Sequence, residues 1–271
     1  MRGHLRFVLL CLAAAGCSPQ VYVTPERLER GLVLVLTGIE GRSPLNQDIC
    51  RGLDAGGVNW AIELVDWTSG VPGGFVINLR DEARNRRQAG EIADRIARYQ
   101  TTYPNRPVVL VGQSGGGGIA AWTAEALKPD KSVDGVILLA ASLSPGYPLE
   151  QALERSRRGI VSFHSRKDWI FLWAGTTVWG TMDGKHTSAA GRVAFDVPVR
   201  GQATLQYKKL FQIPLQPRGQ AGYIDPHIAS SSREFVARYV APLVLTEKWE
   251  PGTIEATLAG ERPDRPMTGG R

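Results

Sequence analysis

Ser114 is the residue whose surroundings point most directly to chemistry. It lies in VLVGQSGGGG, residues 109–118, where an apolar run ends in a hydroxyl surrounded by glycines. The letters from Gly112 to Gly116 match G-x-S-x-G, in which a sharp turn between a strand and a helix exposes a serine nucleophile. Such a turn strains the serine backbone, and side chains at either flanking glycine would collide with the strand or the helix. The stretch therefore predicts a serine that attacks a carbonyl carbon.

The same glycines could instead form a phosphate-binding turn. Gly116, Gly118 and Ala121 formally satisfy G-x-G-x-x-A, a dinucleotide fingerprint. That fingerprint expects an acidic residue at the end of the next strand, and the next apolar run, VILLAASLS, contains none. A P-loop needs a lysine after the glycines, and none follows them. A flexible linker is disfavoured because apolar segments flank the glycines on both sides, so the nucleophile interpretation is preferred.

A serine hydroxyl becomes a nucleophile only when a base takes its proton and a carboxylate orients that base. For a serine on such a turn, the expected chain order is serine, acid, histidine. His227, in GYIDPHIASSSREFV, follows the last strand candidate and is the predicted base, with His186 in reserve. Asp168 directly follows GIVSFHSRK and is the predicted acid. Asp183 and Asp225 are weaker candidates for the acid.

Negative charge on the attacked oxygen calls for backbone N–H donors. One is predicted at Gly115, because the first N–H groups of a helix have no partner within the helix. The other is predicted at Ile39, in the loop LTGIEGRSPLN after the first strand candidate, where Gly38 would let the backbone approach closely. Gly38 and Gly41 could equally be ordinary turn glycines.

The elements that must position these residues alternate along the chain. Short apolar runs typical of buried strands are GLVLVLTG, VNWAIELVD, PVVLVGQ, VDGVILLAA and GIVSFHS, with a further candidate around LQYKKLFQI. Helical spacing is found over residues 80–103, in GIAAWTAEALK and in SSREFVARYVAPLV. This alternation predicts an α/β fold with a mostly parallel central sheet and helices on both faces. Functional residues should gather at the carboxyl ends of its strands.

Four of these stretches together resemble the α/β-hydrolase superfamily. They are strand-TGIEG, strand-GQSGGG-helix, strand-HSRKD and a late GYIDPH before a helix ending in APLV, and the likeness covers residues 31–245. The resemblance implies the α/β-hydrolase fold with Ser114 as nucleophile, Asp168 as acid and His227 as base. Members include esterases, lipases, thioesterases and peptidases, so the fold does not fix the substrate. The early strands are expected to be reduced, since only VYVTP precedes Gly31.

The composition is that of an ordinary folded domain. The chain has 271 residues, of which 43% are hydrophobic and 21% are charged. Its net charge is +6, and removing Arg2 and Arg6 would leave +4. The densest basic run, RNRRQ, lies in a helical stretch that also holds acidic residues, so a solvated helix face is expected rather than a nucleic-acid site. No metal or cofactor is expected, because no histidine and carboxylate cluster has ligand spacing.

The N-terminus predicts export. In MRGHLRFVLLCLAAAGC, Arg2 and Arg6 precede an apolar run that is too short to span a bilayer, which is typical of a secretory signal. LAAAGC resembles a lipobox, so Cys17 is the predicted site of lipidation, and Ser18 after it resembles the pattern sorted to an outer membrane. The predicted location is the periplasmic face of that membrane, held by the N-terminal lipid. Ordinary signal cleavage with secretion is the alternative.

Four segments are expected along the chain: a signal peptide over 1–16, a polar tether over 17–30, an α/β-hydrolase domain over 31–249 and a tail rich in Pro and Gly over 250–271. Cys50 would be the one cysteine inside the domain, so no internal disulfide is expected. Its place in the probable helix NQDICRGL favours a small buried side chain over a nucleophile.

The functional hypothesis is a serine hydrolase that cleaves a small carboxylic ester through an acyl-enzyme intermediate. A peptidase or thioesterase would use the same residues, and a non-catalytic envelope lipoprotein could keep the scaffold for binding. The run WIFLWAGTTVWG contains Trp169, Trp173 and Trp179, which could line an acyl pocket or pack a helix onto the sheet.

Overall fold

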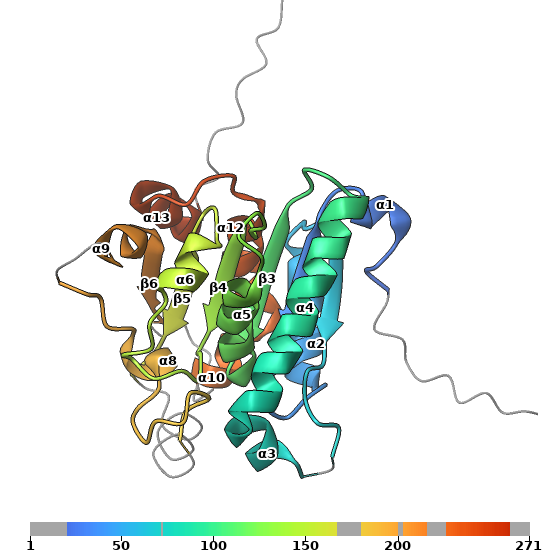
Figure 1. Cartoon of the computed structure of the whole chain (residues 1–271). Helices are drawn as coiled ribbons and strands as arrows, with labels where there is room; N and C mark the ends of the chain where they lie inside the picture. The colour runs from blue at the N-terminus through green and yellow to red at the C-terminus, as the bar shows by residue number, and fades with distance from the viewer. Residues whose placement is uncertain (1–20, 72, 167–179, 200–202, 216–225, 261–271) are drawn as a thin grey trace, which may run out of the picture.

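A six-stranded sheet in which every strand runs parallel to its neighbours forms the centre of the structure (Figure 1). The computed structural model describes residues 21–71, 73–166, 180–199, 203–215 and 226–260. The strands are β1 (Leu32–Leu36), β2 (Ala61–Val65), β3 (Val108–Gln113), β4 (Gly135–Leu139), β5 (Ile160–His164) and β6 (Leu210–Pro214). Their order across the sheet is β2-β1-β3-β4-β5-β6.

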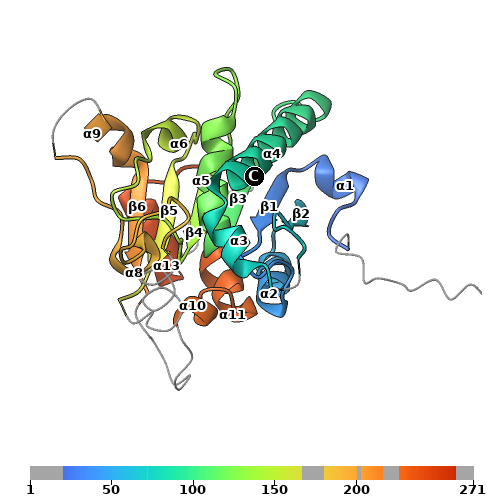
Figure 2. The ribbon, with the colours of Figure 1, turned by 60° about the horizontal axis from the view of Figure 1, so that its bottom comes forward.

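Helices cover both faces of this sheet (Figures 1 and 2). One face packs against α4 (Glu82–Thr102), α5 (Gly115–Ala126) and α6 (Glu150–Glu154). The other packs against α2 (Pro44–Ala55), the π-helix η3 (Val236–Val240), α12 (Ala241–Leu245) and α13 (Pro251–Ala259). The smaller helices are α1 (Pro25–Leu28), α3 (Phe75–Arg80), α8 (Ala190–Val193), α9 (Ala203–Gln206), η2 (Tyr207–Lys209), α10 (Pro226–Ala229) and α11 (Arg233–Phe235). Among the described helices, none has the length and apolar character needed to cross a membrane.

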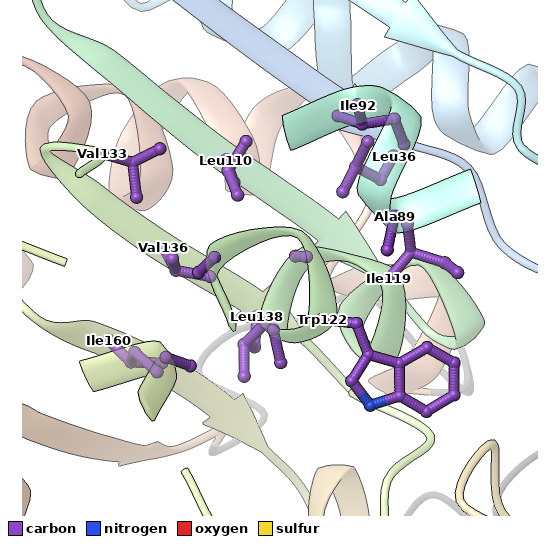
Figure 3. Close-up of a cluster of buried hydrophobic side chains, with 14 of the residues drawn as sticks. Leu36, Ala89, Ile92, Leu110, Ile119, Trp122, Val133, Val136, Leu138 and Ile160 are labelled. Carbon is purple, nitrogen blue, oxygen red and sulfur yellow. The ribbon is translucent and has the colours of Figure 1, made fainter. Parts of the chain in front are cut away.

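Continuous apolar strands fit this arrangement because each face of the sheet is covered. In β1 the side chains of Leu32, Leu34 and Leu36 enter the core beneath α4 and α5, whereas Val33 and Val35 enter the core on the opposite face. The alternation follows from the two-residue period of a strand. Figure 3 shows the first of these cores, where side chains of β1, β3, β4 and β5 meet the helices α4 and α5.

The predicted α/β fold, with a parallel sheet between two helical layers, is confirmed. The last strand begins later than expected, because residues 205–209 of LQYKKLFQI complete α9 and η2 and only residues 210–214 pair with β5. Pro214 ends this strand at the edge of the described sheet, where a residue without an N–H is tolerated.

The segment VYVTP contributes one hydrogen bond to the sheet edge instead of a strand. The carbonyl of Tyr22 accepts from the Ile62 N–H at 3.1 Å, and the Thr24 hydroxyl then caps α1. This short helix is held to the domain, since the Tyr99 hydroxyl donates to the Leu28 carbonyl at 2.7 Å. The end of the segment expected to be a polar tether is therefore packed on the domain. A Thr-Pro pair starts a helix more readily than it continues a strand.

The domain also extends beyond residue 249, the end that was expected from the sequence. Residues 251–259, placed in the tail by their Pro and Gly content, form α13. Ile254 is only 4% exposed and packs in the core with Trp249. A nine-residue helix with Pro at its start gave too short an apolar pattern to be recognised, and tertiary burial decides its structure.

Cys50 lies in α2 with 6% of its surface exposed, in agreement with the predicted buried side chain. Burial raises the pKa of its thiol from 9.0 to about 12. At pH 8 the thiolate would be about one part in ten thousand in the folded chain and about one part in ten after unfolding.

We therefore expect Cys50, in a chain carrying C11S and C17S, to react with a chromogenic disulfide reagent at pH 8 only when denaturant is added. Cys50→Ser in the same background is the control and should not react under either condition. Reaction of the native chain at pH 8 as fast as that of the denatured chain would contradict the buried, protonated thiol.

Candidate active site

The junction between β3 and α5 holds Ser114 in a left-handed backbone conformation. Its φ is 53° and its ψ is −119°, a region that residues other than glycine rarely occupy. Three backbone hydrogen bonds hold this residue: its N–H donates to the Leu139 carbonyl at 2.9 Å, and its carbonyl accepts from Gly117 and Ser142 at 3.0 Å each. The strain, of order 1–3 kcal/mol, is thus offset by contacts with β4 and α5.

The glycines around Ser114 are required by close backbone contacts. A Cβ atom at Gly112 would lie 2.3 Å from the Gly116 carbonyl oxygen. One at Gly116 would lie 2.2 Å from the carbonyl oxygen of Leu36 and 2.4 Å from that of Thr37, in and after β1. The steric reason predicted for these two glycines is confirmed, and it shows that α5 begins directly against the end of β1.

The first turn of α5 also faces the loop after β1. A Cβ atom at Gly115 would lie 3.4 Å from the Ile39 amide nitrogen and 2.5 Å from Ile39 Cγ2. Between described residues, no hydrogen bond uses the N–H of Gly115 or of Ile39. The two amides that were predicted to stabilise an oxyanion thus come from neighbouring backbone segments beside the nucleophile turn. The helix dipole favours negative charge at this position.

Loops that follow β4 and β5 pack beside the first turn of α5. Met182 packs near Gly118, with 3.2 Å between its Cβ and the position that a Cβ at Gly118 would take, and its N–H donates to the Ser142 carbonyl at 2.8 Å. The next residue, Asp183, accepts hydrogen bonds from the Ser144 N–H on one carboxylate oxygen and from the Ser144 hydroxyl on the other. Both oxygens of this weaker acid candidate therefore have a donor that is not a histidine.

Two of the histidines have described side chains. His164 ends β5 and is half-buried, and burial, followed by the charge of Arg166, lowers the pKa of its imidazole. Both effects favour the neutral imidazole. His186, the reserve base, is exposed after the turn from Thr181 to Lys185.

The predicted base, His227, lies in α10, whose backbone follows β6 in the chain and sits at the carboxyl edge of the sheet (Figure 2). Its side chain is outside the described residues. The other predicted positions that lie outside them are Cys17, Asp168, Trp169, Trp173, Trp179 and Asp225. The meeting of serine, acid and base thus stays a prediction. Among described residues, no group of three His, Cys, Asp or Glu side chains could hold a metal ion.

Two buried residues of the site were not predicted from the sequence. Trp67, after β2, donates from its indole N–H to the Thr37 carbonyl at 2.6 Å, and Asn78 of α3 donates from its amide to the Ile39 carbonyl at 2.9 Å. No local pattern marks either residue, because Asn78 is 39 positions from its partner and Trp67 is 30 positions from its own.

One protein-family model matches the middle of the chain. The family model described as the alpha/beta hydrolase fold matches residues 66–166, from the end of β2 to just beyond β5. The comparison with curated proteins found no match.

Several solved structures are similar at low identity. A lipase-esterase related protein from Clostridium acetobutylicum is 11% identical, with a TM-score of 0.44, over 79% of this chain and 93% of that one. A Trichoderma reesei cutinase in complex with a phosphonate inhibitor is 15% identical, with a TM-score of 0.38, over 79% of this chain and 76% of that one. Aspergillus fumigatus lipase B is 12% identical, with a TM-score of 0.46, over 86% of this chain and 57% of that one.

The packing of the nucleophile turn predicts opposite effects for the same substitution at two helical glycines. Gly116→Ala should destabilise the fold by several kcal/mol or prevent folding, because its methyl group would overlap two carbonyl oxygens. Gly90→Ala in α4 is the matched control, since nothing lies within 4 Å of its Cβ position, and it should stabilise the fold by up to ~1 kcal/mol. Urea unfolding of both variants is the measurement. Equal stability of Gly116→Ala and the wild type would refute the close contact between α5 and β1.

Proposed function

Given that the chain has the α/β-hydrolase fold, we propose that it is a serine hydrolase that cleaves a carboxylic ester through an acyl-enzyme intermediate. The observation that carries the proposal is the left-handed turn at Ser114, which directly precedes α5, together with the position of Gly115, the first residue of that helix, beside the Ile39 amide. A strained polar residue at the carboxyl ends of parallel strands is typical of a turn that presents a serine nucleophile.

The proposed reaction has two halves. His227 removes the proton from the Ser114 hydroxyl as its oxygen bonds to the carbonyl carbon, and the negative oxygen that forms is bound by the N–H groups of Gly115 and Ile39. The tetrahedral intermediate then expels the alcohol, which takes the proton from His227. A water molecule, deprotonated by the same histidine, then attacks the acyl carbon. The second tetrahedral intermediate expels the Ser114 oxygen, which takes the proton back from His227, and the acid is released. Asp168 orients the imidazole and stabilises its positive form.

The proposed substrate is a small carboxylic ester, and nothing in these roles requires a metal or a cofactor. A thioester or a peptide would use the same residues. Together with the N-terminal signal, this makes an exported hydrolase in which Cys17 carries the lipid and the domain stays at the periplasmic face of the outer membrane.

Covalent labelling tests the nucleophile. We expect a fluorophosphonate probe to modify one residue of the wild-type chain, Ser114, because only an activated serine attacks the phosphorus. Ser114→Ala should lose labelling and lower the turnover of short-chain p-nitrophenyl esters by ~10³-fold or more. Ser132→Ala is the matched control and should behave as wild type, because Ser132 lies in the loop before β4, at the amino-terminal end of the strands. Absence of labelling in the folded wild-type chain would contradict hydrolysis and favour a binding protein on a hydrolase scaffold.

The rate of the same labelling reaction tests the acid and the base. His227→Ala and Asp168→Asn should each slow labelling by ~10²-fold or more, because the serine loses its base or the base loses its orientation. Asp183→Asn should change the rate by less than about threefold, since both oxygens of Asp183 are bound to Ser144. A large loss in Asp183→Asn together with a normal rate in Asp168→Asn would exchange the roles of the two residues.

A further inference from the structure

The loop after β1 is held by an unusual run of hydrogen bonds. Three successive carbonyl oxygens, those of Thr37, Gly38 and Ile39, each have a donor. The Trp67 indole N–H donates to Thr37 at 2.6 Å, the Gly41 N–H to Gly38 at 3.1 Å, and the Asn78 side-chain amide to Ile39 at 2.9 Å. No hydrogen bond between described residues uses the N–H of Ile39, which lies within this run.

This pattern determines the direction of the Ile39 N–H. That N–H and the Gly38 carbonyl belong to one planar trans peptide and point in opposite directions. The Gly38 carbonyl points to Gly41, so the N–H points away from the turn that the two glycines close. The peptides on either side are pinned by Trp67 and Asn78, so rotation about the flexible Gly38 backbone is blocked from both ends.

Asn78 is itself rigidly held. It is 4% exposed, its side-chain oxygen accepts from the Ser69 N–H at 2.8 Å, and its backbone carbonyl accepts from the Asn85 side chain at 2.6 Å. Asn85 is fully buried in α4, the long helix on the face of the sheet. The contact with Ile39 is therefore anchored through α3 to the core of the domain.

We infer that Asn78 is a positioning residue, which orients the Ile39 amide toward the oxygen of the tetrahedral intermediate before substrate binds; the inference rests on the proposed function. Preorganised donors stabilise developing charge without reorganisation at the moment of reaction. Trp67 acts at the other end of the same loop, but it is fully buried in the core and its replacement would also disturb folding.

Asn78→Asp tests this role because it changes one amide nitrogen to oxygen. The variant keeps the acceptor for Ser69 and removes the donor to Ile39. Loss of a whole oxyanion donor lowers kcat by 10²–10³-fold, so a misdirected donor should lower kcat by about 10- to 100-fold, with KM within about threefold. Asn78→Ala, which also removes the donor, should show the same division between kcat and KM. Rates are expressed per Ser114 labelled by the fluorophosphonate, which corrects for any unfolded fraction.

Gln212→Glu is the matched control. The Gln212 amide donates to the Phe195 carbonyl at 2.9 Å and accepts from the Phe195 N–H at 2.6 Å, so the substitution removes an equivalent bond at β6, far along the sheet from β3. It should lower the melting temperature to a similar degree and leave kcat per labelled site within about twofold.

A second readout separates positioning from stability. A trifluoromethyl ketone adds to the serine and forms a tetrahedral oxyanion, so its inhibition constant should weaken in the Asn78 variants by the same factor as kcat/KM falls. Wild-type kcat per labelled site in both variants, or an unchanged inhibition constant, overturns the inference while leaving the hydrolase intact. Absence of Ser114-dependent turnover in the wild type overturns both the inference and the proposed function.

Discussion

The backbone of Ser114 is the constraint around which the rest of the site is arranged. Its left-handed conformation turns the chain from β3 into α5 within one residue, which brings the first turn of the helix against the end of β1. That approach leaves no room for a Cβ atom at Gly112 or Gly116. The strain is held in place by hydrogen bonds to Leu139 and Ser142, so the neighbouring strand β4 takes part in keeping the turn.

The parallel sheet places residues from several other loops around this turn. Because all six described strands point the same way, the loops after β1, β2 and β4 emerge at one edge and surround the turn. Three side chains at this edge are hydrogen-bonded to neighbouring loops: Asn78 and Trp67 hold the loop of Ile39, and Asp183 is bound to Ser144. The same contacts that satisfy these groups make the edge rigid, and a rigid edge suits preorganised stabilisation of charge.

The strands and long helices could be predicted from the sequence because each has a strong local pattern. Runs such as VVLVGQ can be buried only between two helical layers, and the spacing over residues 80–103 matches α4. The short helices α1 and α13 were not predicted, because neither has such a pattern. α1 is held by Tyr99 of α4, and α13 packs into a core that it shares with residues of β4 and β5. Sequence windows of four to nine residues carry too little periodicity to reveal such contacts.

For the candidate site, the sequence by itself determined the Ser114 turn and the glycines around it, because a sharp junction of strand and helix excludes side chains at fixed spacing. It also determined the order of the predicted serine, acid and histidine along the chain. Only the tertiary structure decided that the Gly115 and Ile39 backbones are neighbours, and that Asn78 reaches the loop from α3. Both depend on how segments 39 or more positions apart pack together, and no local pattern records the packing of distant segments.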